Sequence, residues 1–274
     1  MLAAVASVQF GAALAKTLFD DLGPGGTVFL RVLFAAAVLL ALWRPSLAGR
    51  SRRDLLLVAA FGVSLAGMNL SFYEALDRIP LGIAVTFEFV GPLGVAVGGS
   101  RRALDVLWAI LAAAGILLLS DFGDFGGLDT AGVGFALLAG GLWAAYILLS
   151  ARVGRVFPGG SGLALALVAS SALLVPAGIA DGGGELLQPE LLAIGAAVAM
   201  LSSAIPYSLE LESLRRLPEA VFGVLMSLEP AMAALAGFVV LGQDLRTREL
   251  VAILLVVAAS AGAARGARAV PRDA

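Results

Sequence analysis

Four charged side chains lie inside long apolar stretches of this chain: Lys16, Arg31, Glu88 and Glu229. A charged group within a bilayer costs about 2.5–3.5 kcal/mol on insertion scales, so such residues are candidates for a functional site by default. The chain has no histidine and no cysteine, which excludes imidazole and thiolate catalysis and thiol-ligated metals. The sequence therefore predicts a binding site for a charged solute, with no cofactor, no metal and no enzymatic activity.

Glu88 lies near the middle of one apolar segment, in residues 87–92 (FEFVGP). Proline has no N–H, so Pro92 cannot donate a hydrogen bond to the carbonyl oxygen of Glu88, four residues earlier. One position then offers a carboxylate and an unpaired carbonyl oxygen, which together suit an ammonium group. A structural ion pair of Glu88 with Lys16 or Arg31 is the alternative.

Glu229 lies in the matching stretch of a second proline-containing segment, directly before Pro230. Pro230 leaves the carbonyl oxygen of Met226 without its helical donor. Three roles are open for Glu229: binding a substrate, taking up and releasing a proton, or capping a kinked helix.

Further polar residues occur at helical spacing. Gln9 and Lys16 are seven residues apart, and Asn69 and Tyr73 are four apart, so each pair shares a helix face. Lys16 serves a site or extends to the outer interface, since it lies about one turn from the end of its segment. Asn69 and Tyr73 face a pore or bond to a neighbouring helix. Arg31 either pairs with an acid in the bundle or reaches the outer water.

The remaining basic residues show how these segments cross the membrane. Thirteen of the 18 Lys and Arg fall in five clusters, and two apolar runs separate each cluster from the next. The connectors between the two runs of each such pair hold only Arg78, Arg246 and Arg248. Lys and Arg of short connectors stay on the cytoplasmic side, so both termini are predicted to be cytoplasmic. A hydrophobic content of 60% and a mean hydropathy of +0.99 fit an all-α integral membrane protein. The ten predicted spans are 2–19, 25–43, 54–76, 80–98, 104–120, 130–150, 162–180, 190–211, 218–241 and 249–265.

The two halves of the chain resemble each other. Pro80 and Pro92 are separated by 12 residues, as are Pro218 and Pro230. The sequence therefore predicts two five-helix repeats, residues 1–127 and 128–274. An odd number of spans per repeat makes the halves cross in opposite directions, and such inverted repeats belong to secondary transporters with a site near the midplane.

Four stretches of the chain are distinctive: residues 7–16 (SVQFGAALAK), 62–69 (GVSLAGMN), 80–92 (PLGIAVTFEFVGP) and 225–231 (LMSLEPA). They resemble a known family, the threonine/homoserine exporters of the EamA branch of the drug/metabolite transporter superfamily. The resemblance covers essentially the whole chain. It departs at residues 243–244 (QD), where the family has an acidic residue after the ninth span.

The resemblance implies a ten-helix inverted-repeat fold in a bacterial inner membrane and the export of small neutral amino acids, threonine and homoserine first. Aromatic amino acids are the alternative substrate class. For an amino acid, the carboxylate is assigned to Lys16 with Gln9 and the ammonium group to Glu88, because an unpaired buried charge is costly. The rest of the expected cavity is formed by Asn69, Tyr73 and Glu229.

The expected partners are the small-molecule substrate and the lipid bilayer. The basic clusters are topology signals, so no nucleic acid is expected. The chain has no ATP-binding motif, so an ion gradient or the substrate's own gradient would drive transport, and protons acting through Glu88 or Glu229 are one option. A homodimer through outer helices is compatible with the sequence.

Overall fold

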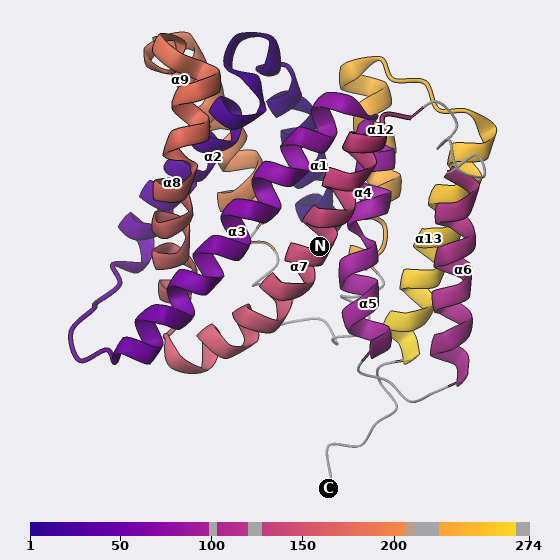
Figure 1. Cartoon of the computed structure of the whole chain (residues 1–274), viewed down its shortest axis with the longest axis horizontal. Coiled ribbons are helices and arrows are strands. Elements are labelled where there is room, and N and C mark those ends of the chain that lie inside the picture. Colours follow the sequence, from indigo (N-terminus) through magenta and orange to yellow (C-terminus); the bar gives the residue numbers. More distant parts are fainter. Residues whose placement is uncertain (99–102, 120–127, 207–208, 210–224, 267–274) are drawn as a thin grey trace, which may run out of the picture.

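The computed structural model describes residues 1–98, 103–119, 128–206, 209 and 225–266. Every regular element in these ranges is helical, which confirms the all-α prediction (Figure 1). The helices are α1 (Leu2–Lys16), α2 (Phe19–Trp43), α3 (Arg52–Arg78), α4 (Leu81–Glu88), α5 (Val90–Gly98), α6 (Ala103–Leu119), α7 (Thr130–Val156), α8 (Ser161–Gly182), α9 (Pro189–Ala199), α12 (Glu229–Leu241) and α13 (Thr247–Gly266). A 3-10 turn, η2 (Gly183–Leu187), follows α8, and a π-helical turn, η3 (Met200–Ala204), follows α9.

The helices have the length and surface of membrane spans. Among the described residues, four segments are long and apolar enough to cross a membrane: α2, α3, α7 and Ser161–Leu187. Shorter apolar helical segments accompany them, at Leu2–Lys16, Leu81–Val95, Pro189–Ala204 and Glu229–Leu241. Large apolar side chains such as Leu56, Ile110 and Phe238 are exposed on the outside. A surface of this kind needs lipid around it, and the chain is a multi-pass membrane protein.

The connector predicted between the first two spans, residues 20–24, is largely helical in the structure. Helix α2 begins at Phe19, and the chain turns at Gly23, whose φ of 62° and ψ of 173° suit glycine. Asp181 on α8 accepts a hydrogen bond from the Gly25 amide at 2.8 Å and so caps the part of α2 that follows the turn. Residues 210–224, with the end of the eighth predicted span and the start of the ninth, lie outside the described residues.

The fourth predicted span is broken in its middle. Helix α4 ends at Glu88, Phe89 forms a turn, and α5 begins with the next residue. A similar turn at Ser227–Leu228 directly precedes α12. Phe89 and Ser227 each lie three residues before a proline, so the two breaks occupy equivalent positions of their segments. Each proline removes a donor from the helical ladder, which is the physical cause of a break at these places.

Helix α7 crosses the break between α4 and α5, and there its backbone touches theirs. A Cβ atom on Gly140 of α7 would lie 2.5 Å from the carbonyl oxygen of Glu88. A Cβ atom on Gly91 of α5 would lie 1.8 Å from the carbonyl oxygen of Gly140. Neither position accepts a side chain unless the helices move apart, so the two glycines hold Glu88 in place against α7.

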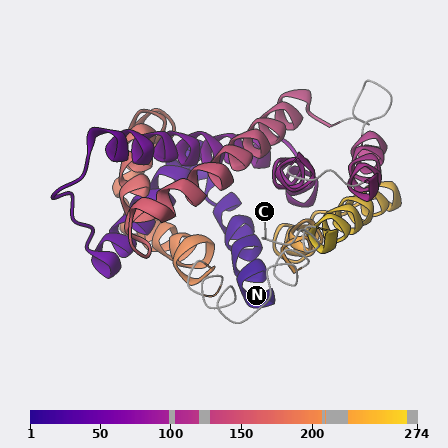
Figure 2. The same cartoon turned by 90° about the horizontal axis from the view of Figure 1, so that it is seen from below.

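Most helix pairs join the two halves of the sequence. Helix α2 packs along α8, α3 along α7 and α8, and α6 along α13, while α12 packs against α1 and α4. Figure 1 shows α6 and α13 side by side at one edge, away from α2, α3 and α8. Seen from below, α1 (indigo) lies between these groups (Figure 2). The residues of α1 are therefore placed to face a central site.

The glycine contact at the break predicts unequal effects at two adjacent positions of α7. Gly140→Ala is expected to destabilise the folded protein by about 1–3 kcal/mol, because the added methyl group meets the Glu88 carbonyl. Gly141→Ala is the control, since nothing lies within 4 Å of its Cβ position, and it is expected to be neutral or to stabilise the helix by up to about 1 kcal/mol. Thermal unfolding of both detergent-solubilised variants checks this, and equal melting temperatures would contradict the close contact.

Candidate functional site

A cavity of about 540 Å³ lies between the helices of the two halves. Four of the predicted site residues line it, namely Gln9, Asn69, Glu88 and Glu229, and Arg31 lies beside them. The remaining described lining residues are Val8, Ala12, Met68, Phe72, Phe89, Pro92, Trp143, Tyr146, Ile147, Ser150, Ser202, Pro206 and Met226.

Arg31 of α2 contributes the positive charge among the described residues of this wall. Its Nη1 donates to the hydroxyl of Tyr73 at 3.3 Å, and its guanidinium lies 5.5 Å from the centre of the Tyr73 ring. Its Nη2 donates to the carbonyl oxygen of Ser202, also at 3.3 Å. A guanidinium has five N–H donors, enough to keep such contacts and bind an anion as well.

The contact between Arg31 and Ser202 follows from Pro206. A proline there cannot donate to the carbonyl of Ser202, four residues back, or to that of Leu201, five residues back. The chain forms the π-helical turn η3 at this place. The two carbonyl oxygens accept hydrogen bonds from Arg31 and, at 2.6 Å, from the hydroxyl of Ser7. The proline thus supplies the oxygens that tie α1 and α2 to η3.

Glu88 and Glu229 bring two carboxylates to the same cavity. Their side chains are buried, at 8% and 6% exposure. Glu88 is the last residue of α4 and Glu229 the first of α12, so both lie at the ends of half-length helices. Arg31 lines the same cavity. One wall region therefore combines a cation with two acids.

Two amide side chains complete the polar lining. Asn69 Nδ2 donates to the Leu65 carbonyl at 2.8 Å, which commits its N–H side to the helix and leaves Oδ1 as the acceptor. Gln9 is 2% exposed, and its Oε1 has no hydrogen-bond partner. Both residues add acceptor oxygens to the cavity wall.

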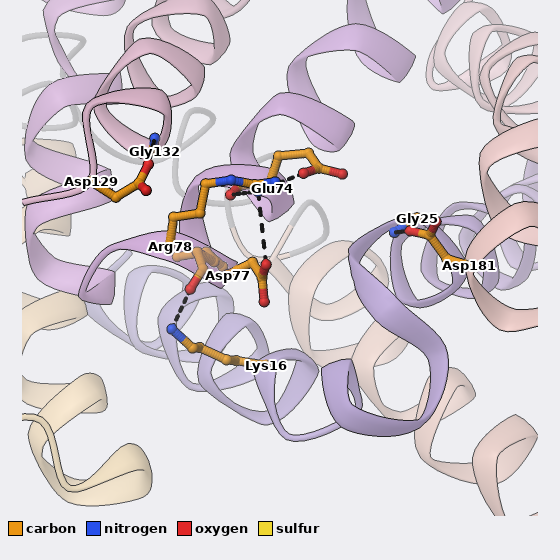
Figure 3. A network of polar contacts seen from close by, with 9 residues as sticks. Lys16, Gly25, Glu74, Asp77, Arg78, Asp129, Gly132 and Asp181 are labelled. Atoms are coloured by element: carbon orange, nitrogen blue, oxygen red, sulfur yellow. Dashed lines mark hydrogen bonds and ion pairs between the residues drawn. The ribbon is translucent and has the colours of Figure 1, made fainter.

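Lys16 and Tyr73, also predicted for the site, are not among the described lining residues. The Lys16 ammonium donates to the carbonyl oxygen of Leu76 near the end of α3, and the Asp77 carboxylate attracts it there (Figure 3). Pro80 has no N–H to occupy that carbonyl, which leaves it to the lysine. Tyr73 is fully buried and contacts the site through Arg31. The structure thus places Arg31 at the cavity and Lys16 at the end of α3.

Polar contacts of several helices lie near Lys16, some within one helix and some between helices (Figure 3). Arg78 pairs with Glu74 at 2.6 Å, and Asp129 caps the start of α7 by accepting from the Gly132 amide at 2.7 Å. The side chain of Gln243 accepts a hydrogen bond from the Leu81 amide at 3.0 Å. Below these contacts the side chains of Leu76, Ile79 and Leu81 are at most 1% exposed. These three apolar side chains are packed and shielded from solvent.

The sequence reasoning missed an aromatic wall and Ser202. Phe72, Phe89, Trp143 and Tyr146 line the cavity, and the Phe89 and Trp143 rings meet edge to face at 5.5 Å between centroids. An aromatic residue in an apolar helix gives no spacing signal, so nothing in the sequence marked these four. Pro206 was the signal for Ser202, because it identifies the carbonyls that need another donor.

Comparisons with known proteins can now be set beside this geometry. Residues 130–265 match the EamA-like transporter family. The threonine/homoserine exporter RhtA of Salmonella typhimurium (strain LT2) is 40% identical over 273 residues, covering 99% of this chain and 92% of the relative. The protein of the same name from Escherichia coli (strain K12) is 41% identical over 263 residues, covering 96% and 89%.

This chain belongs to the EamA-like transporter family. A protein of known crystal structure shares the fold, with a TM-score of 0.66 at 22% identity over 97% of this chain and 96% of the other. The chain is thus a multi-pass helical membrane transporter of the drug/metabolite transporter superfamily, and the cavity is its candidate site for a solute. Among the described residues, no group of three or more His, Asp or Glu side chains is arranged to hold a metal ion.

The position of the cavity predicts which serines a reagent reaches. Because the chain has no cysteine, Ser150→Cys at the cavity wall and Ser170→Cys in the packed core can each be labelled alone. The thiol at position 150 is expected to react with a small maleimide in detergent at least about tenfold faster, since only the deprotonated, accessible thiol reacts. Gel-shift labelling measures both rates, and equal rates would contradict the cavity.

Proposed function

We propose that this chain exports threonine and homoserine by alternating access. The observation that carries the proposal is a cavity in which Arg31, Glu88 and Glu229 lie together in a protein whose relatives are named threonine/homoserine exporters. An amino acid carries one positive and one negative group, and each needs an opposite charge in a low-dielectric cavity. The cavity offers both signs.

In this proposal Arg31 binds the substrate's carboxylate, the role that the sequence assigned to Lys16. A guanidinium holds a carboxylate through two parallel hydrogen bonds, which a lysine cannot do. Glu88, Glu229 and the Asn69 oxygen accept from the ammonium group. The C-terminal end of α4 carries partial negative charge and adds to the attraction for the ammonium group, while the partial positive charge at the N-terminal end of α12 stabilises the Glu229 carboxylate.

The proposed transport cycle uses two inverted repeats, residues 1–127 and 128–274, with both termini in the cytoplasm of a bacterial inner membrane. Support comes from the pairing of α2 with α8, α4 with α12 and α6 with α13, because in these three of the five pairs a predicted span packs against its counterpart in the other repeat. The equivalent breaks at Phe89 and Ser227 add to it. The packed corner at Lys16 and the half-exposed lining residues near the C-terminal end of α7 correspond to a state open toward the cytoplasm.

Aromatic amino acids are the second candidate substrates. The four aromatic side chains in the lining favour them, and a cavity of 540 Å³ falls in the range of about 300–1,000 Å³ that holds drug-sized ligands. The charged groups would bind the same backbone of either substrate, so only the side-chain region distinguishes the two classes.

Energy for export would come from an ion gradient or the substrate gradient itself. Protons acting through Glu88 or Glu229 are the coupling ion of this proposal, because both carboxylates lie in the cavity and can change charge between its two open states. A homodimer is compatible with the exposed apolar helix faces and is not required for the cycle.

Counterflow of labelled threonine in proteoliposomes tests the function. Saturable uptake that unlabelled threonine and homoserine inhibit at lower concentration than phenylalanine or tryptophan is the expected result. Inhibition by the aromatic amino acids alone would replace the small substrates by the second class. The absence of any inhibition by amino acids would overturn the proposal.

Removing the Glu88 charge tests the binding mode. Glu88→Gln is expected to raise the half-saturating threonine concentration at least about tenfold, since a charge-assisted hydrogen bond contributes roughly 1.5–3 kcal/mol. Glu74→Gln is the matched control, because Glu74 pairs with Arg78 outside the cavity and its loss should leave uptake unchanged. Both are compared at equal amounts of inserted protein. Loss of the folded protein in Glu88→Gln, with uptake per folded molecule intact, would assign Glu88 a structural role.

A further inference from the structure

Two buried polar atoms on the cavity wall have no hydrogen-bond partner: Oε1 of Gln9 and Oγ of Ser202. Two further serines of the described residues, Ser170 and Ser260, are in the same state but do not line the cavity. An unsatisfied buried polar atom has lost its hydrogen bonds to water without replacement, which is unfavourable. Two residues of the cavity lining therefore carry a polar group that a suitable solute could pair with.

Both atoms lie where α1 packs against η3. The Ser7 hydroxyl ties α1 to the Leu201 carbonyl at 2.6 Å, and a Cβ atom on Gly11 would lie 2.3 Å from Ser202 Oγ. Glycine at position 11 is thus what leaves room for the Ser202 hydroxyl. Residues 7–11 of α1 run directly along η3, so Gln9 and Ser202 belong to one region of the wall.

This region adjoins the proposed carboxylate site. The carbonyl oxygen of Ser202 itself accepts a hydrogen bond from Arg31. In an α-amino acid, the side chain begins one carbon away from the carboxylate. With the carboxylate on Arg31, the side chain of the substrate would therefore lie near Gln9 and Ser202.

The two groups are chemically matched to a hydroxyl. An amide oxygen only accepts a hydrogen bond, whereas a serine hydroxyl both donates and accepts. A substrate hydroxyl can donate to Gln9 Oε1 and accept from Ser202, while a methyl group in its place can do neither. Both atoms are covered by protein, and binding a solute would require rotation about the side-chain bonds of Gln9 and Ser202.

We propose that Gln9 and Ser202 form a subsite for the side-chain hydroxyl group of the substrate and make the transporter selective for hydroxylated amino acids over hydrocarbon isosteres. This inference rests on the proposed function, because it requires an amino acid in the cavity. A site that binds a hydroxyl through buried polar groups discriminates against the analogue that lacks it, since those groups are then left unpaired.

Valine is the decisive competitor, because it is threonine with a methyl group in place of the hydroxyl. In threonine counterflow, the wild type is expected to need at least about tenfold more valine than threonine for half-inhibition. Ser202→Ala is expected to lower that ratio about five- to tenfold. The change should come mainly from weaker inhibition by threonine, while the concentration of valine for half-inhibition changes little. Ser203→Ala is the matched control, because Ser203 is the adjacent residue and is also buried but does not line the cavity. The valine-to-threonine ratio of this variant should equal that of the wild type.

The ratio of the half-inhibitory concentrations of valine and threonine distinguishes a hydroxyl subsite from general damage to the site, because general damage weakens the binding of both amino acids. Gln9→Met, which keeps the side-chain length, is the second variant and decides the question if Ser202→Ala does not fold. A wild-type ratio near one, or wild-type ratios in the variants that fold, would overturn the subsite while leaving amino-acid export intact. Failure of all amino acids to compete would overturn export and the subsite with it.

Discussion

Every backbone N–H and C=O inside a bilayer needs a partner, because there is no water in the hydrocarbon to supply one. This chain repeatedly breaks that rule with proline, which removes a donor and leaves a carbonyl oxygen four residues earlier. The two cations inside the apolar stretches satisfy such oxygens. Lys16 donates to Leu76, whose helical donor would come from Pro80, and Arg31 donates to Ser202, whose donor would come from Pro206. The positions of both charges thus follow from backbone hydrogen bonding.

The same constraint shapes the cavity. Where the helical ladder is interrupted, a long span becomes two half-helices. Their inner ends carry partial charges inside the membrane, whereas a continuous helix has such charges only at the membrane surface. The end of α4 brings Glu88 to the cavity and the start of α12 brings Glu229. A broken helix also loses rigidity, and here Gly91 and Gly140 restore it by bringing α7 into backbone contact with the break. The site therefore combines irregular backbone with a tightly packed support.

A transporter must also move, and its contacts divide into two kinds. The corner around Lys16 is held by single hydrogen bonds. The bond from the charged Lys16 to Leu76 contributes roughly 1.5–3 kcal/mol, and the bond from the Leu81 amide to Gln243 contributes about 0.5–1.5 kcal/mol. Such contacts can be exchanged for others between two states of similar energy. The long pairings of α2 with α8 and of α6 with α13 bury far more surface and suit elements that stay together. In the proposed cycle, opening at the Lys16 corner breaks these hydrogen bonds and separates the apolar side chains packed there.

The sequence by itself determined the class of molecule, because hydropathy and the sorting of arginines act over whole segments and survive any detail of packing. It also marked Glu88, Glu229, Gln9 and Asn69 as candidates, since an intramembrane polar group and a proline are local signals, and these four side chains line one cavity. Only the tertiary structure decided between the two cations. Lys16 and Arg31 are equally costly in an apolar helix, and which one faces the cavity depends on which freed carbonyl lies within reach of each side chain. That is a matter of how α3 and η3 pack against α1 and α2, and sequence spacing within one helix carries no information about it.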